Sequence, residues 1–276
     1  MSLIVTPMSA GMGAYVEGVD LSQPLSNDVT SQLRNLWLEH LVIVIRGQEL
    51  SSEQYLQFAQ RWGQPVAYPF LKGLDGFDVI TPVLKKENEK VNFGGIWHTD
   101  TAYQDRPPMA TMLLAKQLPS IGGDTLFSNQ YLAYEGLSEG LKSALRGVRA
   151  VFRSDKKRVS QTRQARIDET GRDVDKDWLQ GIHPVFRTHP ETGKTALYVN
   201  PAHTTQFEGW TEQESEGLLD MLYRHQIREE YQCRLQWKYG DLAIWDNRCA
   251  MHYPINDYHG QRRLLHRITL AGDIPE

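Results

Sequence analysis

Three side chains of the types that bind metal ions stand out in the sequence: His98 and Asp100, two residues apart, and His252 far downstream. Side chains two residues apart on an extended strand project from the same face, so His98 and Asp100 are expected to share one ion. Two imidazole nitrogens and one carboxylate oxygen suit Fe(II), and three ligands on one face of an octahedron leave the opposite face open. The set therefore predicts a catalytic metal centre.

Other interpretations of these residues exist. A His-x-Asp tripeptide also arises by chance, because surface histidines are common. A structural zinc site usually has four protein ligands with thiolates among them, and the chain has only Cys233 and Cys249. Structural zinc is therefore disfavoured, and Cys249 is expected to be a buried small side chain.

A pair of arginines near the end of the chain suggests an anion site. In a strand over residues 263–270, a period of two places Arg263 and Arg267 on one face. A guanidinium offers a rigid fork of donors that suits a carboxylate or another oxyanion. Solvated surface charge is the alternative, but the alternation and the neighbouring His266 favour an inward-facing pair.

Several separated motifs, taken in order and spacing, resemble the taurine dioxygenase / TfdA family of Fe(II)- and 2-oxoglutarate-dependent dioxygenases. They lie at residues 97–100, 122–125, 245–248, 252, 263 and 267, and the similarity begins near the start at residues 18–21. The resemblance therefore runs nearly end to end. It implies a double-stranded β-helix, or jelly-roll, whose open mouth holds the metal.

The resemblance also assigns roles. It implies that Fe(II) is bound by His98, Asp100 and His252, and that the distal carboxylate of the cosubstrate 2-oxoglutarate is held by Arg263 and Thr125. Dioxygen is then the second cosubstrate. The residues expected at the substrate are Arg267 for its anionic end, with Phe70, Thr101 and His203 along the wall.

Departures from the taurine-type pattern bear on the substrate. Phe70 stands where those enzymes have a histidine at the sulfonate, and Asn92 is displaced from the asparagine that contacts the taurine amine. The resemblance thus implies hydroxylation of a small, partly apolar organic anion, with 2-oxoglutarate converted to succinate and CO₂. Sulfonates, alkyl sulfates, aryloxyalkanoates and similar carboxylates remain candidates. The presence of Asp100 favours hydroxylation, because halogenating relatives have a small residue there.

Two other classes of function stay open at this point. One is a jelly-roll protein that binds a metal or ligand without oxidising anything. The other is a metal-dependent hydrolase that uses the same three ligands and needs no dioxygen. Both keep the site and differ only in its chemistry.

Composition fits an ordinary enzyme. With 276 residues, 40% of them hydrophobic, residues 1–276 are expected to form a single domain. A net charge of −4 with dispersed basic residues argues against a nucleic-acid partner. We find no signal-like or membrane-spanning apolar run, so a cytoplasmic protein without a membrane partner is expected. The family suggests a homo-oligomer, either a dimer or a tetramer.

The sequence pattern predicts an α+β fold for the elements that position the site, with a strand-rich core and flanking helices. Helices are expected from about residue 26 to 40, from 52 to 62 and from 212 to 228, with two short ones within 128–148. Strands are expected at residues 41–45, 111–115, 196–199, 233–237, 242–245 and 263–270. The polar stretch 153–176 is either a solvated loop or a lid over the site.

Overall fold

Strands from both ends of the chain meet in one sheet. A computed structural model describes residues 3–157, 159, 160, 164, 167 and 178–276, so the lid predicted over 153–176 falls mostly outside the described residues. Within the described part, the largest sheet has eight strands in the order β1-β2-β3-β14-β6-β16-β4, with β5 also paired to β16. Their bounds are β1 Ile4–Pro7, β2 Ala14–Glu17, β3 Val42–Ile45, β4 Pro65–Val66, β5 Thr81–Lys85, β6 Ala110–Gln117, β14 Leu242–Asp246 and β16 Arg263–Leu270.

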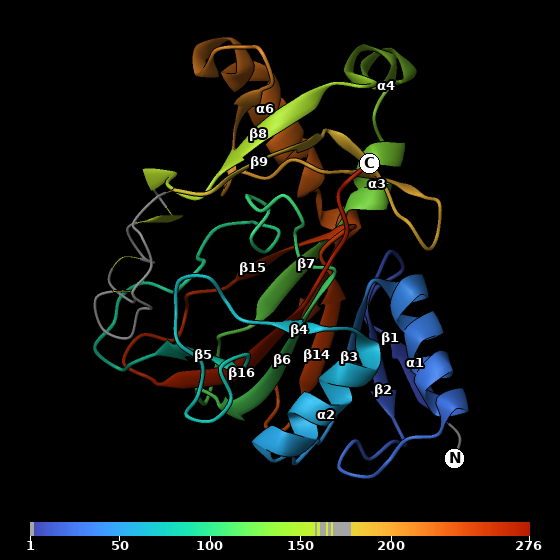
Figure 1. Ribbon diagram of the computed structural model, residues 1–276, viewed down its shortest axis with the longest axis vertical. Coiled ribbons are helices and arrows are strands. Elements are labelled where there is room, and N and C mark those ends of the chain that lie inside the picture. The colour runs from blue at the N-terminus through green and yellow to red at the C-terminus, as the bar shows by residue number, and fades with distance from the viewer. Residues whose placement is uncertain (1–2, 158, 161–163, 165–166, 168–177) are drawn as a thin grey trace.

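Two helices cover one face of this sheet, as Figure 1 shows in blue and cyan. They are α1 (Asn27–His40) and α2 (Ser52–Trp62), and α2 begins at the capping box predicted from Ser51 and Gln54. Trp37 and Phe58 pack from the helices against the strands in one apolar cluster. The apolar contacts between these helices and the sheet hold the N-terminal part of the chain against it.

A smaller sheet covers the opposite face. It contains β13 (Gln232–Leu235), β7 (Thr125–Asn129) and β15 (Ala250–Pro254), and Phe127 and Trp245 lie in the apolar cluster between the two sheets. Because both faces of the large sheet are covered, β3 and β14 are buried at every position. Of the predicted site residues, Thr125 lies in β7, His252 in β15, and Arg263 and Arg267 in β16.

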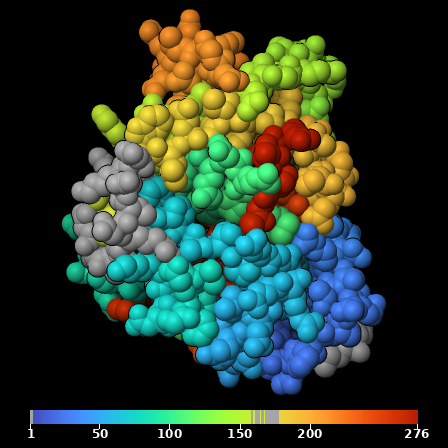
Figure 2. Space-filling view, viewed as in Figure 1, coloured from blue at the N-terminus to red at the C-terminus, as the bar shows by residue number. Residues whose placement is uncertain are grey.

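The remaining elements form a third region, at the top of Figures 1 and 2. A sheet of β12 (Thr204–Phe207), β8 (Arg149–Arg153) and β9 (Gln180–Pro184) packs with α6 (Glu212–Gln226). The other elements here are β10 Phe186–Thr188, β11 Thr195–Leu197, α3 Gln130–Glu135, α4 Glu139–Leu145 and the short 3₁₀ turn Glu229–Tyr231. Phe152 and Leu222 are fully buried where sheet and helix meet.

The expected mixture of helices and strands is confirmed, and so are the helices and strands predicted from the sequence, to within a few residues at their ends. Gly136 ends α3 and separates it from α4, as predicted. None of the described helices is long and apolar enough to cross a membrane.

Both cysteines are free thiols buried in the core, as predicted for Cys249. Burial raises the pKa of Cys233 to about 12 and raises that of Cys249 well above its ordinary value. Neither sulfur is therefore ionised at neutral pH.

Candidate metal centre and its two pockets

The two histidines of the predicted metal site are brought together by the backbone. His98 and His252 form an isolated antiparallel bridge, with N–H···O distances of 3.0 and 2.9 Å. Residues directly opposite each other in an antiparallel pair project from the same face. The two imidazole centroids accordingly lie 4.0 Å apart.

The strand argument for His98 and Asp100 was wrong. Residues 99–103 form no strand, and Asp100 begins a turn in which Thr101 has φ 41°. The carboxylate nevertheless reaches the imidazoles, because Asp100 Oδ1 lies 3.7 Å from His98 Nε2. One donor atom each from His98, Asp100 and His252 falls within 4.8 Å of the others. A turn, not a strand period, positions the third donor.

Hydrogen bonds fix which atoms face the shared space. His98 Nδ1 lies 2.7 Å from the carbonyl oxygen of Ile96, which can only accept, so Nδ1 has the proton and Nε2 has the free lone pair. Asp100 Oδ2 accepts from the Thr111 hydroxyl at 2.6 Å, which leaves Oδ1 toward the histidines. Hydrogen bonds of this kind, made by the side-chain atoms that do not face the metal, orient metal ligands.

The protonation states also suit a metal. Burial lowers the pKa of His98, and burial together with repulsion from His98 lowers the pKa of His252 to about 3. Burial would raise the pKa of Asp100, but the surrounding imidazoles and Arg267 outweigh it and lower that pKa to about 2. At neutral pH the set is two neutral imidazoles and one carboxylate, which is the form that binds a divalent cation.

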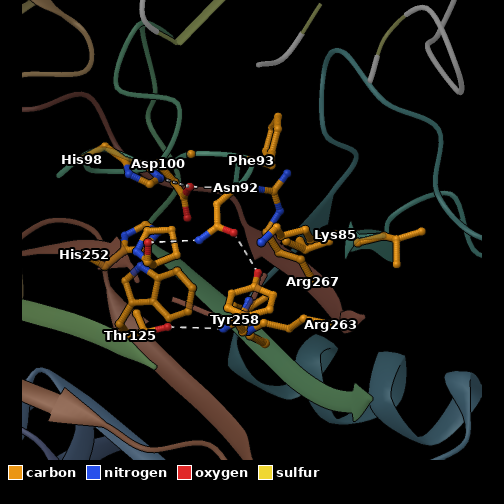
Figure 3. Close-up of a pocket in the computed structure, with 16 residues that line it drawn as sticks. Lys85, Asn92, Phe93, His98, Asp100, Thr125, His252, Tyr258, Arg263 and Arg267 are labelled. Carbon is orange, nitrogen blue, oxygen red and sulfur yellow. Dashed lines mark hydrogen bonds and ion pairs between the residues drawn. The ribbon is translucent and has the colours of Figure 1, made fainter. Parts of the chain in front are cut away.

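A first pocket extends from the donors toward Arg263 (Figure 3). Arg263 is 5% exposed, forms no ion pair with any described carboxylate, and its Nε has no hydrogen-bond partner there. Thr125 accepts from Trp237 Nε1 at 3.0 Å and from Arg263 Nη2 at 3.5 Å, and both of these only donate. The guanidinium and the Thr125 hydroxyl proton can therefore serve an anion in this pocket.

A second pocket lies on the other side of the donors. Arg267 borders both pockets, 3.8 Å from Asp100 Oδ1 and 4.3 Å above the ring of Tyr68. Its Nη2 has no hydrogen-bond partner among the described residues. The other lining residues are mostly apolar or aromatic: Tyr68, Phe93, Gly94, Ile96, Thr101, Tyr103, Val159, Ala202 and His203. One cation thus faces a largely apolar space.

The remaining substrate-site predictions have different positions. Thr101 and His203 line the second pocket, and the His203 ring is 4.9 Å from that of Tyr103. Phe70 lines neither pocket and packs behind the wall, 6.0 Å from Tyr103 and 5.8 Å from Tyr68. Phe70 can therefore affect a ligand in either pocket only indirectly, for example through those two rings.

A buried histidine holds the turn after Asp100. His183 Nε2 lies 2.9 Å from the carbonyl oxygens of Ala102 and Gln104, so its proton bridges both. Thr101 within this turn has a positive φ, which is costly for a β-branched residue. The His183 contact helps to keep the chain in that conformation.

His183 also makes a testable contribution to pH dependence. Burial lowers its pKa from 6.5 to about 4. Below pH 6.5 the unfolded chain binds a proton that the folded protein excludes, so the free energy of unfolding falls as the pH drops from 6.5 toward 4, by about 1.4 kcal/mol per unit. We expect His183→Gln to remove this part of the slope in urea unfolding between pH 6.5 and 4.5. Exchange of the exposed His259 should leave the slope intact; an unchanged slope in His183→Gln would contradict the assignment.

Sequence reasoning assigned no role to Asn92 or Tyr258, which line the first pocket. Asn92 donates to the carbonyl oxygens of Pro254 and Ile255 and accepts from Tyr258, and so joins the two segments that wall the first pocket. Tyr258 has no local sequence signal. The motif at residues 245–248 includes Trp245, which lines the first pocket. Its link to Asp100 passes through Thr111 of β6, and no local pattern connects these two segments.

A second group of potential ligands, His189, Asp246 and Cys249, is also buried. His189 Nδ1 accepts two backbone N–H groups, so its Nε2 has the proton and donates to Asp246. Arg248 donates to both oxygens of the same carboxylate at 2.8 and 2.7 Å. The donor atoms are already used, and this group is a structural network.

Two imidazoles and one carboxylate beside open space match the donor set that mononuclear non-haem Fe(II) oxygenases use. The sequence profile described as "Taurine catabolism dioxygenase TauD, TfdA family" matches residues 5–269. The chain therefore belongs to the TauD/TfdA family, as its motifs predicted.

Individual relatives agree with this membership. The chain is 32% identical to an alkylsulfatase of Acinetobacter baylyi over 97% of its own length and 84% of the relative. It is 31% identical to an alpha-ketoglutarate-dependent sulfate ester dioxygenase of Pseudomonas putida, over 100% of this chain and 91% of that one. A solved taurine dioxygenase from Burkholderia xenovorans superposes with a TM-score of 0.83 at 34% identity, covering 100% of this chain and 91% of that one.

Proposed function

We propose that this chain is an Fe(II)- and 2-oxoglutarate-dependent dioxygenase that hydroxylates a small organic anion with an apolar body. The observation on which the proposal rests is a pair of pockets that meet at His98 and Asp100, each lined by a buried arginine that lacks a full set of partners. A two-anion reaction at one metal needs this arrangement. A hydrolase would need only one substrate pocket. A protein that only binds a metal would need no pocket for a second anion.

The donor set fits a ferrous ion. His98 Nε2 and Asp100 Oδ1 face one space, and His252 joins them with its ring against His98. A bound ferrous ion would supply the redox chemistry with dioxygen at this place. Three protein ligands leave room for a chelating cosubstrate, which is the feature that separates such a site from structural zinc.

The first pocket suits 2-oxoglutarate. We assign its distal carboxylate to Arg263 and Thr125, because a buried guanidinium and a free hydroxyl proton together match one carboxylate. Leu113 and Trp245 supply apolar lining to the same pocket. A five-carbon dianion with charge at both ends and methylenes between them fits this distribution.

The second pocket sets the class of substrate. Arg267 would hold the anionic head, and the rings of Tyr68, Phe93 and Tyr103 would enclose the body. Thr101 and His203 complete the wall, and Phe70 supports it from behind. These surfaces exclude water from the reacting carbon, which protects the oxidation from side reactions. Sulfate esters, sulfonates and aryloxyalkanoates with an apolar group are the candidates.

We extend the proposal to the wider architecture. The large sheet and the β13-β7-β15 sheet would form the two halves of a jelly-roll, with residues 1–276 as one domain. A homodimer or homotetramer in the cytoplasm, without nucleic-acid or membrane partners, remains our expectation.

A succinate-release screen tests the function. Purified protein with Fe(II), 2-oxoglutarate and dioxygen should form succinate in proportion to one or more anions of a panel containing alkyl sulfates, sulfonates and aryloxyalkanoates. Omission of dioxygen should abolish product, which separates this reaction from hydrolysis. No substrate-dependent succinate with any anion, together with no visible charge-transfer band on anaerobic addition of Fe(II) and 2-oxoglutarate, would overturn the proposal.

The same screen tests Arg267. Because its guanidinium would pair with the substrate's head, Arg267→Ala should raise the KM for the active anion by about 10-fold or more, as expected for loss of a charged hydrogen bond of 1.5–3 kcal/mol. Arg262→Ala is the control, since Arg262 is partly exposed and lies 3.8 Å from Glu87. An unchanged KM in Arg267→Ala would remove Arg267 from the substrate site.

A further inference from the structure

A chain of hydrogen bonds lies behind the carboxylate of Asp100. Trp245 Nε1 donates to Asn247 Oδ1 at 2.9 Å, Asn247 Nδ2 donates to Thr111 Oγ1 at 2.8 Å, and Thr111 Oγ1 donates to Asp100 Oδ2 at 2.6 Å. Every member is buried, with Thr111 and Asn247 fully so. The chain joins β14, the turn after it and β6 to the metal site.

The direction of each bond is fixed by chemistry. An indole N–H can only donate, so Asn247 must present its carbonyl oxygen to Trp245 and its NH₂ to Thr111. An amide NH₂ also only donates, so Thr111 must accept with a lone pair. Its one proton is then left for Asp100. No other arrangement of these protons satisfies the chain.

The consequence concerns the number of carboxylate oxygens that Asp100 can offer. A carboxylate can bind a cation through one oxygen or through both. Here Oδ2 is committed to a short, charge-assisted hydrogen bond, and only Oδ1 faces His98. A carboxylate without that bond could turn and present both oxygens, which would take up a position that the cosubstrate needs.

We propose that Thr111, with its proton directed by Asn247, is a positioning residue that restricts Asp100 to a single ligand oxygen and so keeps the cosubstrate positions open. The inference rests on the proposed function and goes beyond it. It assigns a specific task to a residue that contacts no ligand, and it explains why a threonine is buried at this place in β6.

The test compares Thr111→Val, which keeps the shape and removes the hydroxyl, with Thr111→Ser, which keeps the hydroxyl. Metal binding is measured by anaerobic titration with Co(II), cosubstrate binding by the visible band with Fe(II) and 2-oxoglutarate, and turnover by succinate release. Thr269→Val is the matched control, because Thr269 is paired with Thr111 across the sheet but donates to Val66.

For Thr111→Val we expect the Kd for 2-oxoglutarate to rise and kcat to fall by about 10- to 100-fold, the usual range for loss of an orienting contact. The Co(II) Kd should move by less than about threefold, because one ligand oxygen remains available. Thr111→Ser and Thr269→Val should stay within about threefold of the wild type on every readout.

Asn247→Asp gives an independent check. An aspartate side chain at residue 247 can only accept, so it would draw the Thr111 proton away from Asp100 and should reproduce the Thr111→Val pattern. Wild-type cosubstrate binding in Thr111→Val, or equal losses of Co(II) and cosubstrate affinity, would overturn the inference. If the wild type itself binds neither Co(II) nor 2-oxoglutarate, the proposed function fails instead, and the melting temperature of each apo variant reports whether it folds.

Discussion

Replacing Asp100 with alanine is expected to reduce succinate formation by at least about 1,000-fold, equivalent to roughly 4 kcal/mol of barrier. Asp100 is the only anionic donor among the three, and both histidines are neutral at pH 7. Without it, Arg267 would lie beside two neutral imidazoles and oppose a divalent cation. Metal affinity should therefore fall together with the rate, as measured by Co(II) titration and by succinate release with the active anion.

Two variants make this prediction specific. Asp100→Asn keeps the size of the side chain and removes its charge, so it should resemble the alanine variant. Glu139→Ala removes an exposed carboxylate on α4 and should change neither quantity. An Asp100→Ala protein that still binds Co(II) as tightly as the wild type would place the metal elsewhere.

Replacing Arg263 with alanine is expected to weaken 2-oxoglutarate binding by about 2–5 kcal/mol, the usual cost of truncating one partner of a buried charge pair. At about 1.4 kcal/mol per decade this is a roughly 30-fold or larger rise in the 2-oxoglutarate concentration required. Arg263 is buried and has no described carboxylate partner, so its charge is available for the cosubstrate. The measurement is the dependence of the visible band and of succinate release on 2-oxoglutarate.

Metal binding should be unchanged in Arg263→Ala, because the guanidinium does not contact the donors. Arg263→Lys should recover only part of the affinity, since a lysine lacks the planar fork. Arg262→Ala again serves as the control, because Arg262 directly precedes β16 and lies 3.8 Å from Glu87. If Arg263→Ala impaired only the prime substrate and Arg267→Ala only 2-oxoglutarate, the two arginines would have exchanged roles.

The sequence predicted the helices because their ends are local. The capping boxes at Ser51 and Thr211 involve residues only three apart, and both form as expected. The strands at 111–115 and 263–270 were also recognised, since buried strands are short apolar or alternating runs. Shorter strands such as β4 and β10 went unrecognised, because two or three residues contain no period.

The site was predictable in residue type and only partly in position. The donors His98, Asp100 and His252 were identified from their motifs, but the reason they converge was not. His98 lies opposite His252 through pairing across 154 residues of sequence, which no local pattern encodes. The hydrogen bond between Thr111 and Asn247 was missed for the same reason, since the two residues are 136 apart in the sequence. The direction of the hydrogen bonds from Asn247 through Thr111 to Asp100 could be worked out only once the pairing of the distant strands was known.

The two buried thiols have a consequence for durability. If the proposed ferrous centre reacts with dioxygen, unproductive turnover would release oxidants inside the protein. Thiolates are usually oxidised first, but Cys233 and Cys249 are buried and remain protonated at neutral pH. We therefore expect oxidative damage at the metal and at nearby rings such as Trp245, which lies 4.7 Å from the His252 ring, before it reaches the sulfurs of the core. Ascorbate, which keeps iron reduced, should prolong the working life of this protein more than a thiol reductant does.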